Sequence, residues 1–162
     1  TGSVSHTEEV PSFLPDRFEP GTPNIPGILG LHAALCDLEQ TDMGKLHQHE
    51  LELTQYFING LMQMDPPEST LRAIGKHNTI ERTSVVSVQT LQTDMARVAY
   101  EMDDTYGIMT RVGLHCAPSA HKTLGTYPEG TIRFSFGPEN THHEVDLALH
   151  ALAEITGSPY HL

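Results

Sequence analysis

The sequence is poor in basic residues. Lysine and arginine together number 9 against 21 aspartates and glutamates, which gives a formal net charge of −12. Proteins that bind nucleic acid or anionic membranes need clustered positive side chains to neutralise phosphate groups. The sequence has no basic run, so we expect neither a nucleic-acid partner nor a membrane partner. In such an acidic chain the isolated arginines Arg111 and Arg133 stand out as candidate functional residues.

Cysteine is also scarce, and long apolar runs are missing. The two cysteines, Cys36 and Cys116, lie far apart in the sequence and do not form a disulfide framework. No segment has the length or composition of a signal peptide or a membrane span. These absences predict a reducing, cytoplasmic setting. The sequence opens on Thr1 without an initiator methionine, so we expect it to be a piece of a longer chain.

Several motifs that carry chemistry are absent. They include Gly-x-Ser-x-Gly, the Walker A loop and the dinucleotide-binding fingerprint. The 11 histidines raise the question of a metal site, since His115, Cys116 and His121 could approach one ion. No Cys-x-x-Cys or His-Glu-x-x-His pattern accompanies them, so we expect no metal.

The periodicity of the chain changes after residue 25. Prolines recur throughout the first stretch and oppose a regular helix, so residues 1–25 are expected to form an extended arm or linker. Residues 26–162 show helical and strand periodicities and are expected to form a small α+β domain. Its architecture is predicted to be a two-layer sandwich, with helices packed on a small, mainly antiparallel sheet. We expect helices over 26–38, 44–64, 94–106 and from Thr141 onward, and strands over 70–74, 83–90, 108–112 and 131–136.

Cys116 has a setting that suits a reactive thiol. It follows a predicted strand that carries Arg111, it is preceded by His115, and Ala-Pro comes after it. A thiol is a strong nucleophile only as the thiolate, and a nearby arginine or histidine favours that form. We therefore expect Cys116 on a loop that leaves the strand. The alternative is a small buried hydrophobic residue, which is a common role of free cysteine.

Arg133 and Thr22 are two further candidates. Arg133 alternates with Ile132 and Phe134 and faces away from them, so its planar donors could bind a substrate carboxylate. A solvent-facing arginine on a half-exposed sheet is the alternative. Thr22 lies in a turn before a predicted helix start, where backbone N–H groups favour a phosphate. A turn in which Asn24 caps the helix explains the same residues.

Three segments resemble, in order, the C-terminal part of the cysteine desulfurases and selenocysteine lyase-like enzymes. These enzymes are class V aminotransferases, which are pyridoxal-phosphate enzymes of fold type I. The resemblance allows a match over nearly the whole chain, which would then be the small domain of such an enzyme. The segments are residues 17–24, residues 111–117, and residues 131–136 together with Asn140, Thr141 and Glu144.

The resemblance implies a role for each candidate residue. Cys116 would be the nucleophile that takes sulfur from L-cysteine as a persulfide and leaves L-alanine. Arg133 would bind the substrate α-carboxylate, and Arg111 would border the pocket and favour the thiolate. Thr22 would hydrogen-bond the phosphate of pyridoxal 5′-phosphate, usually in the partner's site of a homodimer. A sulfur-acceptor protein is an expected partner.

The cofactor's lysine has no counterpart in this sequence. By the resemblance it lies upstream in a large domain, and Lys45, Lys76 and Lys122 do not occupy a matching position. The isolated chain is therefore expected to be inactive. Leu114 and Pro118 depart from the family pattern and leave the sulfur acceptor and the exact amino-acid substrate open. Three alternative functions are also kept. These are a related class V lyase or aminotransferase, a non-catalytic partner-docking domain, and a cofactor-free thiol enzyme that uses a His115–Cys116 pair.

Overall fold

The computed structural model describes residues 6, 8–19, 21–64 and 70–160, and the chain divides into two compact units, Thr1–Met43 and Gly44–Leu162. The first unit contains α1, which runs from Ile25 to Gln40. The division therefore groups α1 with the residues before it, and the domain boundary expected between residues 25 and 26 stays a prediction. In the part of the chain that the structure describes, no helix is long and apolar enough to cross a membrane.

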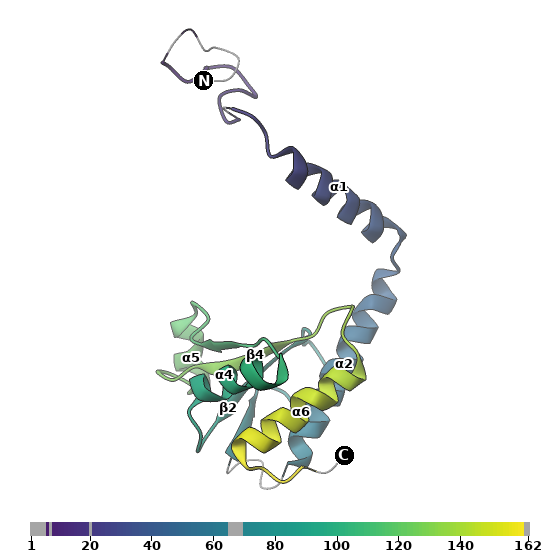
Figure 1. Ribbon diagram of the computed structural model, residues 1–162, viewed down its shortest axis with the longest axis vertical. Helices are drawn as coiled ribbons and strands as arrows, with labels where there is room; N and C mark the ends of the chain where they lie inside the picture. The colour runs from purple at the N-terminus through teal and green to yellow at the C-terminus, as the bar shows by residue number, and fades with distance from the viewer. Residues whose placement is uncertain (1–5, 7, 20, 65–69, 161–162) are drawn as a thin grey trace. The chain divides into compact units, whose positions relative to one another are not determined.

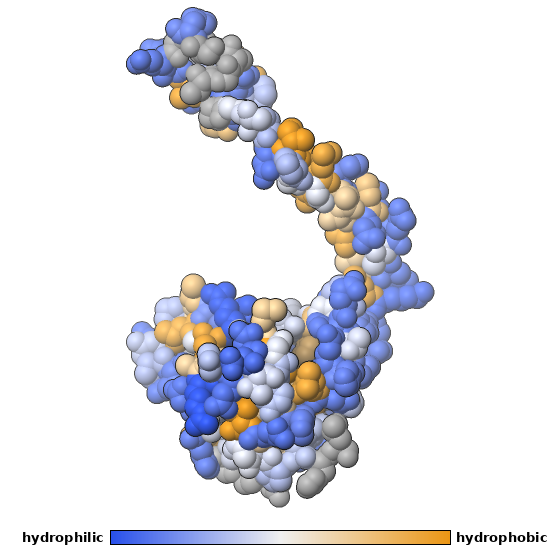
Figure 2. Space-filling view, viewed as in Figure 1, coloured by the Kyte–Doolittle hydropathy of each residue, from blue (hydrophilic) through white to orange (hydrophobic). Residues whose placement is uncertain are grey.

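Helix α1 begins where its capping residues predict. The Asn24 side chain accepts a hydrogen bond from the Gly27 N–H at 3.1 Å, and a proline occupies the first turn. No residue of α1 is buried within the chain. Figure 2 shows hydrophobic side chains gathered along this helix, and the exposed ones include Ile28, Leu29 and Leu35.

The second unit is built on a four-stranded antiparallel sheet (Figure 1). Its strands are β1 (Leu71–Ile74), β2 (Val85–Thr90), β3 (Arg111–Gly113) and β4 (Thr131–Ser135), in the spatial order β1-β2-β4-β3. All three strand pairs are antiparallel, which confirms the α+β fold with an antiparallel sheet. β3 is shorter than predicted, because residues 108–110 are not part of the ladder.

Three helices share one core with the sheet: α2 (Met43–Gln63), α4 (Met95–Tyr106) and α6 (His142–Thr156). The inward residues of the central strands, such as Val86 and Ile132, are fully buried in this core. The ring of Phe57 on α2 lies 4.8 Å from that of Phe134 on β4. At the start of α6, Thr141 and Glu144 form the predicted capping box.

Among the residues that the structure describes, one helix was not predicted. The sequence analysis expected a loop after Cys116, but α5 spans Pro118–Leu124 and begins directly after the thiol turn. Its ends carry ordinary signals, a proline in the first turn and Gly125 in the left-handed conformation after the last. The helix is too short to show a periodic apolar face, which explains why periodicity did not reveal it.

Candidate functional site

The strand register places the two candidate arginines side by side. Arg111 on β3 pairs directly with Arg133 on β4, so both side chains project from the same face of the sheet. Ile132 and Phe134 project from the other face and are buried in the core. Two like charges in directly opposite positions destabilise a sheet, so the Arg111–Arg133 pair lowers the stability of the fold. Its arrangement suits an anionic ligand that both guanidinium groups can bind.

Cys116 lies in a tight turn that follows β3. The Ala117 N–H donates to the Leu114 carbonyl at 2.8 Å, and the two central residues, His115 and Cys116, have φ angles of 50° and 59°. Positive φ angles at both central residues are characteristic of a type I′ β-turn, in which glycine and asparagine usually occupy these positions. Cys116 is exposed, so the alternative of a small buried hydrophobic residue is wrong.

A positive charge lies beside the thiol. Arg111 Nη2 is 4.0 Å from Cys116 Sγ, within the contact range for a sulfur acceptor. In the described part of the chain, no histidine nitrogen hydrogen-bonds to this sulfur. The His115–Cys116 pair needed for a cofactor-free thiol enzyme is therefore not formed in the structure.

His115 also belongs to this site, although the family resemblance implied no role for it. A hydrogen bond of 3.1 Å connects its Nε2 with Thr131 Oγ1 on β4. Burial lowers the pKa of His115, and the positive charges of Arg133, His121 and Arg111 lower it further. The alternation of residues 131 and 133 on one strand face was the available signal for Thr131.

Two buried polar atoms in this corner have no hydrogen-bond partner among the described residues. They are Nδ1 of His115 and Nε of Arg133, from two side chains that are themselves half-buried. A buried polar atom without a partner costs about 1–3 kcal/mol, so natural proteins usually satisfy it. The two unpartnered atoms mark a place where a bound polar ligand would complete the hydrogen bonding.

The lowered pKa of His115 makes unfolding dependent on pH. As the pH falls below the ordinary histidine pKa of 6.5, unfolded chains take up a proton that folded chains resist, so the free energy of unfolding decreases. Urea unfolding at about pH 7.5 and about pH 5.5 measures this decrease. His115→Phe should show a smaller decrease than the parent chain. An equal decrease in both proteins would contradict the assigned environment.

Thr22 belongs to the first unit, where it is exposed just before α1. The structure bears out Asn24 as the helix cap, and the role of Thr22 at a phosphate stays a prediction.

Two of the lysines have other partners: Lys76 pairs with Glu81 at 2.8 Å, and the Lys122 ammonium lies 5.1 Å from the centre of the Tyr127 ring. Within residues 6, 8–19, 21–64 and 70–160, no three potential metal ligands come together.

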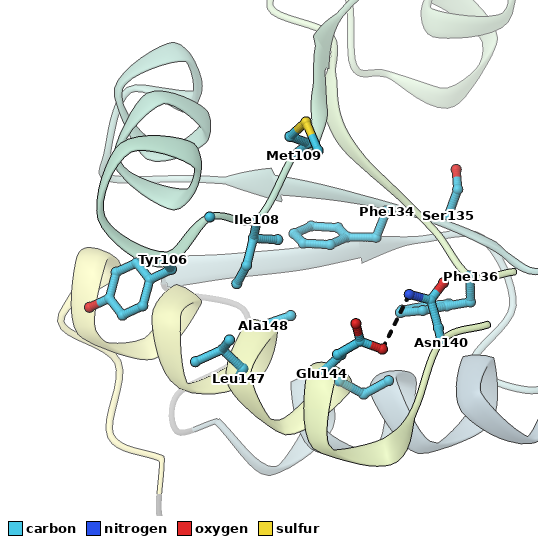
Figure 3. A pocket seen from close by; sticks show the side chains of 12 residues that line it. Tyr106, Ile108, Met109, Phe134, Ser135, Phe136, Asn140, Glu144, Leu147 and Ala148 are labelled. Atoms are coloured by element: carbon cyan, nitrogen blue, oxygen red, sulfur yellow. Dashed lines mark hydrogen bonds between the residues drawn. The ribbon is translucent and has the colours of Figure 1, made fainter.

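A cleft of about 320 Å³ lies elsewhere in the second unit, between the end of α4, β4 and the start of α6 (Figure 3). Its walls are mostly apolar, with Phe134 and Phe136 from the sheet region. At its polar end the Asn140 amide donates to the Glu144 carboxylate at 3.5 Å. None of the candidate residues Cys116, Arg111, Arg133 and Thr22 lines this cleft.

Comparison with known sequences gives related proteins over most of the chain. The family model described as aminotransferase class-V matches residues 2–148. A probable cysteine desulfurase of Pyrococcus abyssi is 35% identical over 144 residues, which cover 89% of this chain and 34% of the relative. A probable cysteine desulfurase of Staphylococcus epidermidis is 33% identical over 157 residues, which cover 93% and 35%. The chain thus spans about a third of the length of these curated relatives.

Solved structures give the same result. The apo structure of a cysteine desulfurase from Thermococcus onnurineus matches with a TM-score of 0.75 and 34% identity, over 88% of this chain and 34% of that one. The cysteine desulfurase CsdA from Escherichia coli, in an S-sulfonic acid form, matches with a TM-score of 0.72 and 27% identity, over 88% and 34%. The predicted resemblance and the predicted fold class are both confirmed.

Proposed function

Because this chain belongs to the aminotransferase class-V family, we propose that it is the C-terminal small domain of a cytoplasmic, pyridoxal-phosphate-dependent cysteine desulfurase. The observation that carries the proposal is the position of two arginines next to a thiol. Arg111 and Arg133 lie side by side on the neighbouring strands β3 and β4, and the exposed thiol of Cys116 lies beside Arg111. The names of the relatives support the same activity. An anion-binding pair next to a free thiol fits a substrate that has both a carboxylate and a sulfur atom.

Arg133 binds the α-carboxylate of L-cysteine in this proposal. Its half-buried position restricts the side chain, and its unpartnered Nε adds a donor in line with those of the guanidinium fork. Arg111 is more exposed and lies between this carboxylate site and Cys116. It therefore contributes positive charge to both the substrate and the reacting thiol.

Cys116 performs the sulfur transfer. Its thiolate attacks Sγ of the substrate, so a sulfur–sulfur bond forms while the substrate's Cβ–Sγ bond breaks. The electron pair of the broken bond stays on the carbon fragment, which takes up a proton and leaves as L-alanine. The persulfide remains on Cys116, whose exposed position lets a sulfur-acceptor protein reach it.

The residues of this chain fit the substrate side of a cofactor site. When bound, pyridoxal 5′-phosphate supplies an electron sink for the substrate's Cα. Thr22, next to the helix start at Asn24, would hold its phosphate across a homodimer, and the lysine that binds it covalently would lie outside this chain. The unpartnered Arg133 Nε and His115 Nδ1 suit a polar ligand beside Cys116. The isolated chain is therefore expected to be inactive.

Substitution of Arg133 tests the carboxylate site. In the full-length enzyme, Arg133→Ala should raise the KM for L-cysteine about 10- to 100-fold, because charge-assisted hydrogen bonds to the carboxylate are lost. Steady-state kinetics of alanine formation measure the change. The matched control is Arg97→Ala, which removes an exposed arginine that pairs with Glu101 on α4 and should leave the KM unchanged. Equal KM values for the Arg133 variant and the parent would refute the assignment.

A further inference from the structure

The turn that carries Cys116 has an unfavourable backbone for its sequence. His115 and Cys116 both have positive φ angles, 50° and 59°, where side chains other than those of glycine and asparagine are disfavoured. Such conformations persist when the surrounding structure holds them, and they are concentrated at functional sites. The Leu114–Ala117 hydrogen bond closes the turn but does not attach it to the sheet.

The attachment comes from His115. Its Nε2 is hydrogen-bonded to Thr131 Oγ1 at 3.1 Å, and Thr131 is a β4 residue with only 1% of its surface exposed. The imidazole also lies near His121, with ring centres 5.7 Å apart. His121 is itself fixed, because it is buried and its Nδ1 is hydrogen-bonded to Thr126 Oγ1 at 2.7 Å. The imidazole is therefore held between a strand and α5.

We propose that His115 is a positioning residue whose hydrogen bond to Thr131 holds the 114–117 turn so that Cys116 Sγ stays beside Arg111. This inference rests on the proposed function, because it concerns the geometry of the sulfur-transfer thiol. His115 does not hydrogen-bond to the thiol in the described part of the chain, and it acts through the backbone of the turn.

The electrostatics of this corner agree with a positioning role. Burial and the neighbouring positive charges of Arg133, His121 and Arg111 lower the pKa of His115, so its imidazole is neutral at neutral pH. A neutral ring adds no third positive charge to the arginine pair. It still provides the hydrogen-bonding nitrogen that Thr131 requires.

The reactivity of Cys116 toward iodoacetamide tests the proposal in this chain without the cofactor. A Cys36→Ser background removes the other thiol, so alkylation reports on Cys116 alone. Thr131→Ser retains the hydroxyl and should keep the parent rate, whereas Thr131→Val has the same shape without the hydroxyl and should react about fivefold more slowly. His115→Phe keeps an aromatic ring without the hydrogen bond and should be slowed similarly. Thermal unfolding identifies the variants that are folded.

A double-mutant cycle separates positioning from a general loss of structure. Arg111→Gln should also slow alkylation about fivefold, since the nearby charge promotes thiolate reactivity. If the hydrogen bond acts by keeping the thiol near that charge, Arg111→Gln combined with Thr131→Val should be no slower than either variant. Equal rates for Thr131→Val and Thr131→Ser, additive effects, or no effect of Arg111→Gln would each overturn the proposal. These outcomes do not depend on sulfur transfer, which the enzyme assays test separately.

Discussion

Replacing Cys116 with alanine in the full-length enzyme is expected to lower the kcat for sulfur release from L-cysteine by at least about 100-fold, because the attacking sulfur is removed. The arginine pair, which is the proposed substrate-binding site, remains in this variant, so binding of L-cysteine should change little. The rates of alanine and sulfide formation in the presence of a reductant measure the effect. Cys36→Ala is the matched control, since Cys36 lies on α1 in the other unit, and it should retain the parent rate.

The control also defines the result that contradicts the assignment. A Cys116→Ala enzyme that releases sulfur at the parent rate does not use this thiol. Loss of activity in Cys36→Ala, with Cys116 intact, would instead move the nucleophile to α1. Either result would mean that the thiol beside the Arg111–Arg133 pair is not the sulfur-transfer nucleophile.

Gly130→Ala is expected to destabilise the second unit by about 3 kcal/mol, through overpacking and backbone strain together. Gly130 precedes β4 with a φ of +83°, and a Cβ atom there would lie 2.2 Å from the Gly113 carbonyl oxygen at the end of β3. Contact this close with backbone forces the two strands apart at the end of the ladder where Gly113 pairs with Thr131. Urea unfolding monitored by circular dichroism measures the loss.

Gly125→Ala is the matched control for backbone strain alone. Gly125 has a φ of +67°, but a Cβ atom there would meet nothing within 4 Å. Its loss should be about 1 kcal/mol, the cost of a positive φ angle without a steric clash. Equal losses in the two variants would show that the close approach of β3 and β4 contributes nothing.

The sequence predicted the parts of the fold that have a strong period. The strict alternation over 131–136 predicted β4 and placed Arg133 on the face opposite Ile132, and the register of the sheet agrees. The capping box at Thr141 and the cap at Asn24 are local patterns that need no tertiary information. For the same reason the helix starts were more accurate than the extent of β3, which depends on pairing with β4.

The geometry of the site could be predicted only in part. Alternation gave the face of Arg133 but not its partner, because the Arg111–Arg133 pairing is set by the register between two distant segments. The turn with positive φ angles at His115 and Cys116 could not be predicted from the sequence, since such turns are normally recognised by glycine or asparagine at these positions. The hydrogen bond between His115 and Thr131 depends on both features and was therefore not predictable.

The central claim is that sulfur from L-cysteine is transferred to the thiol beside Arg111. Mass spectrometry of peptides from the full-length enzyme, incubated with L-cysteine and without a reductant, tests it most directly. The account predicts one additional sulfur atom on the peptide that contains Cys116 and none on the peptide that contains Cys36. Alanine that accumulates while the Cys116 peptide stays unmodified would contradict it.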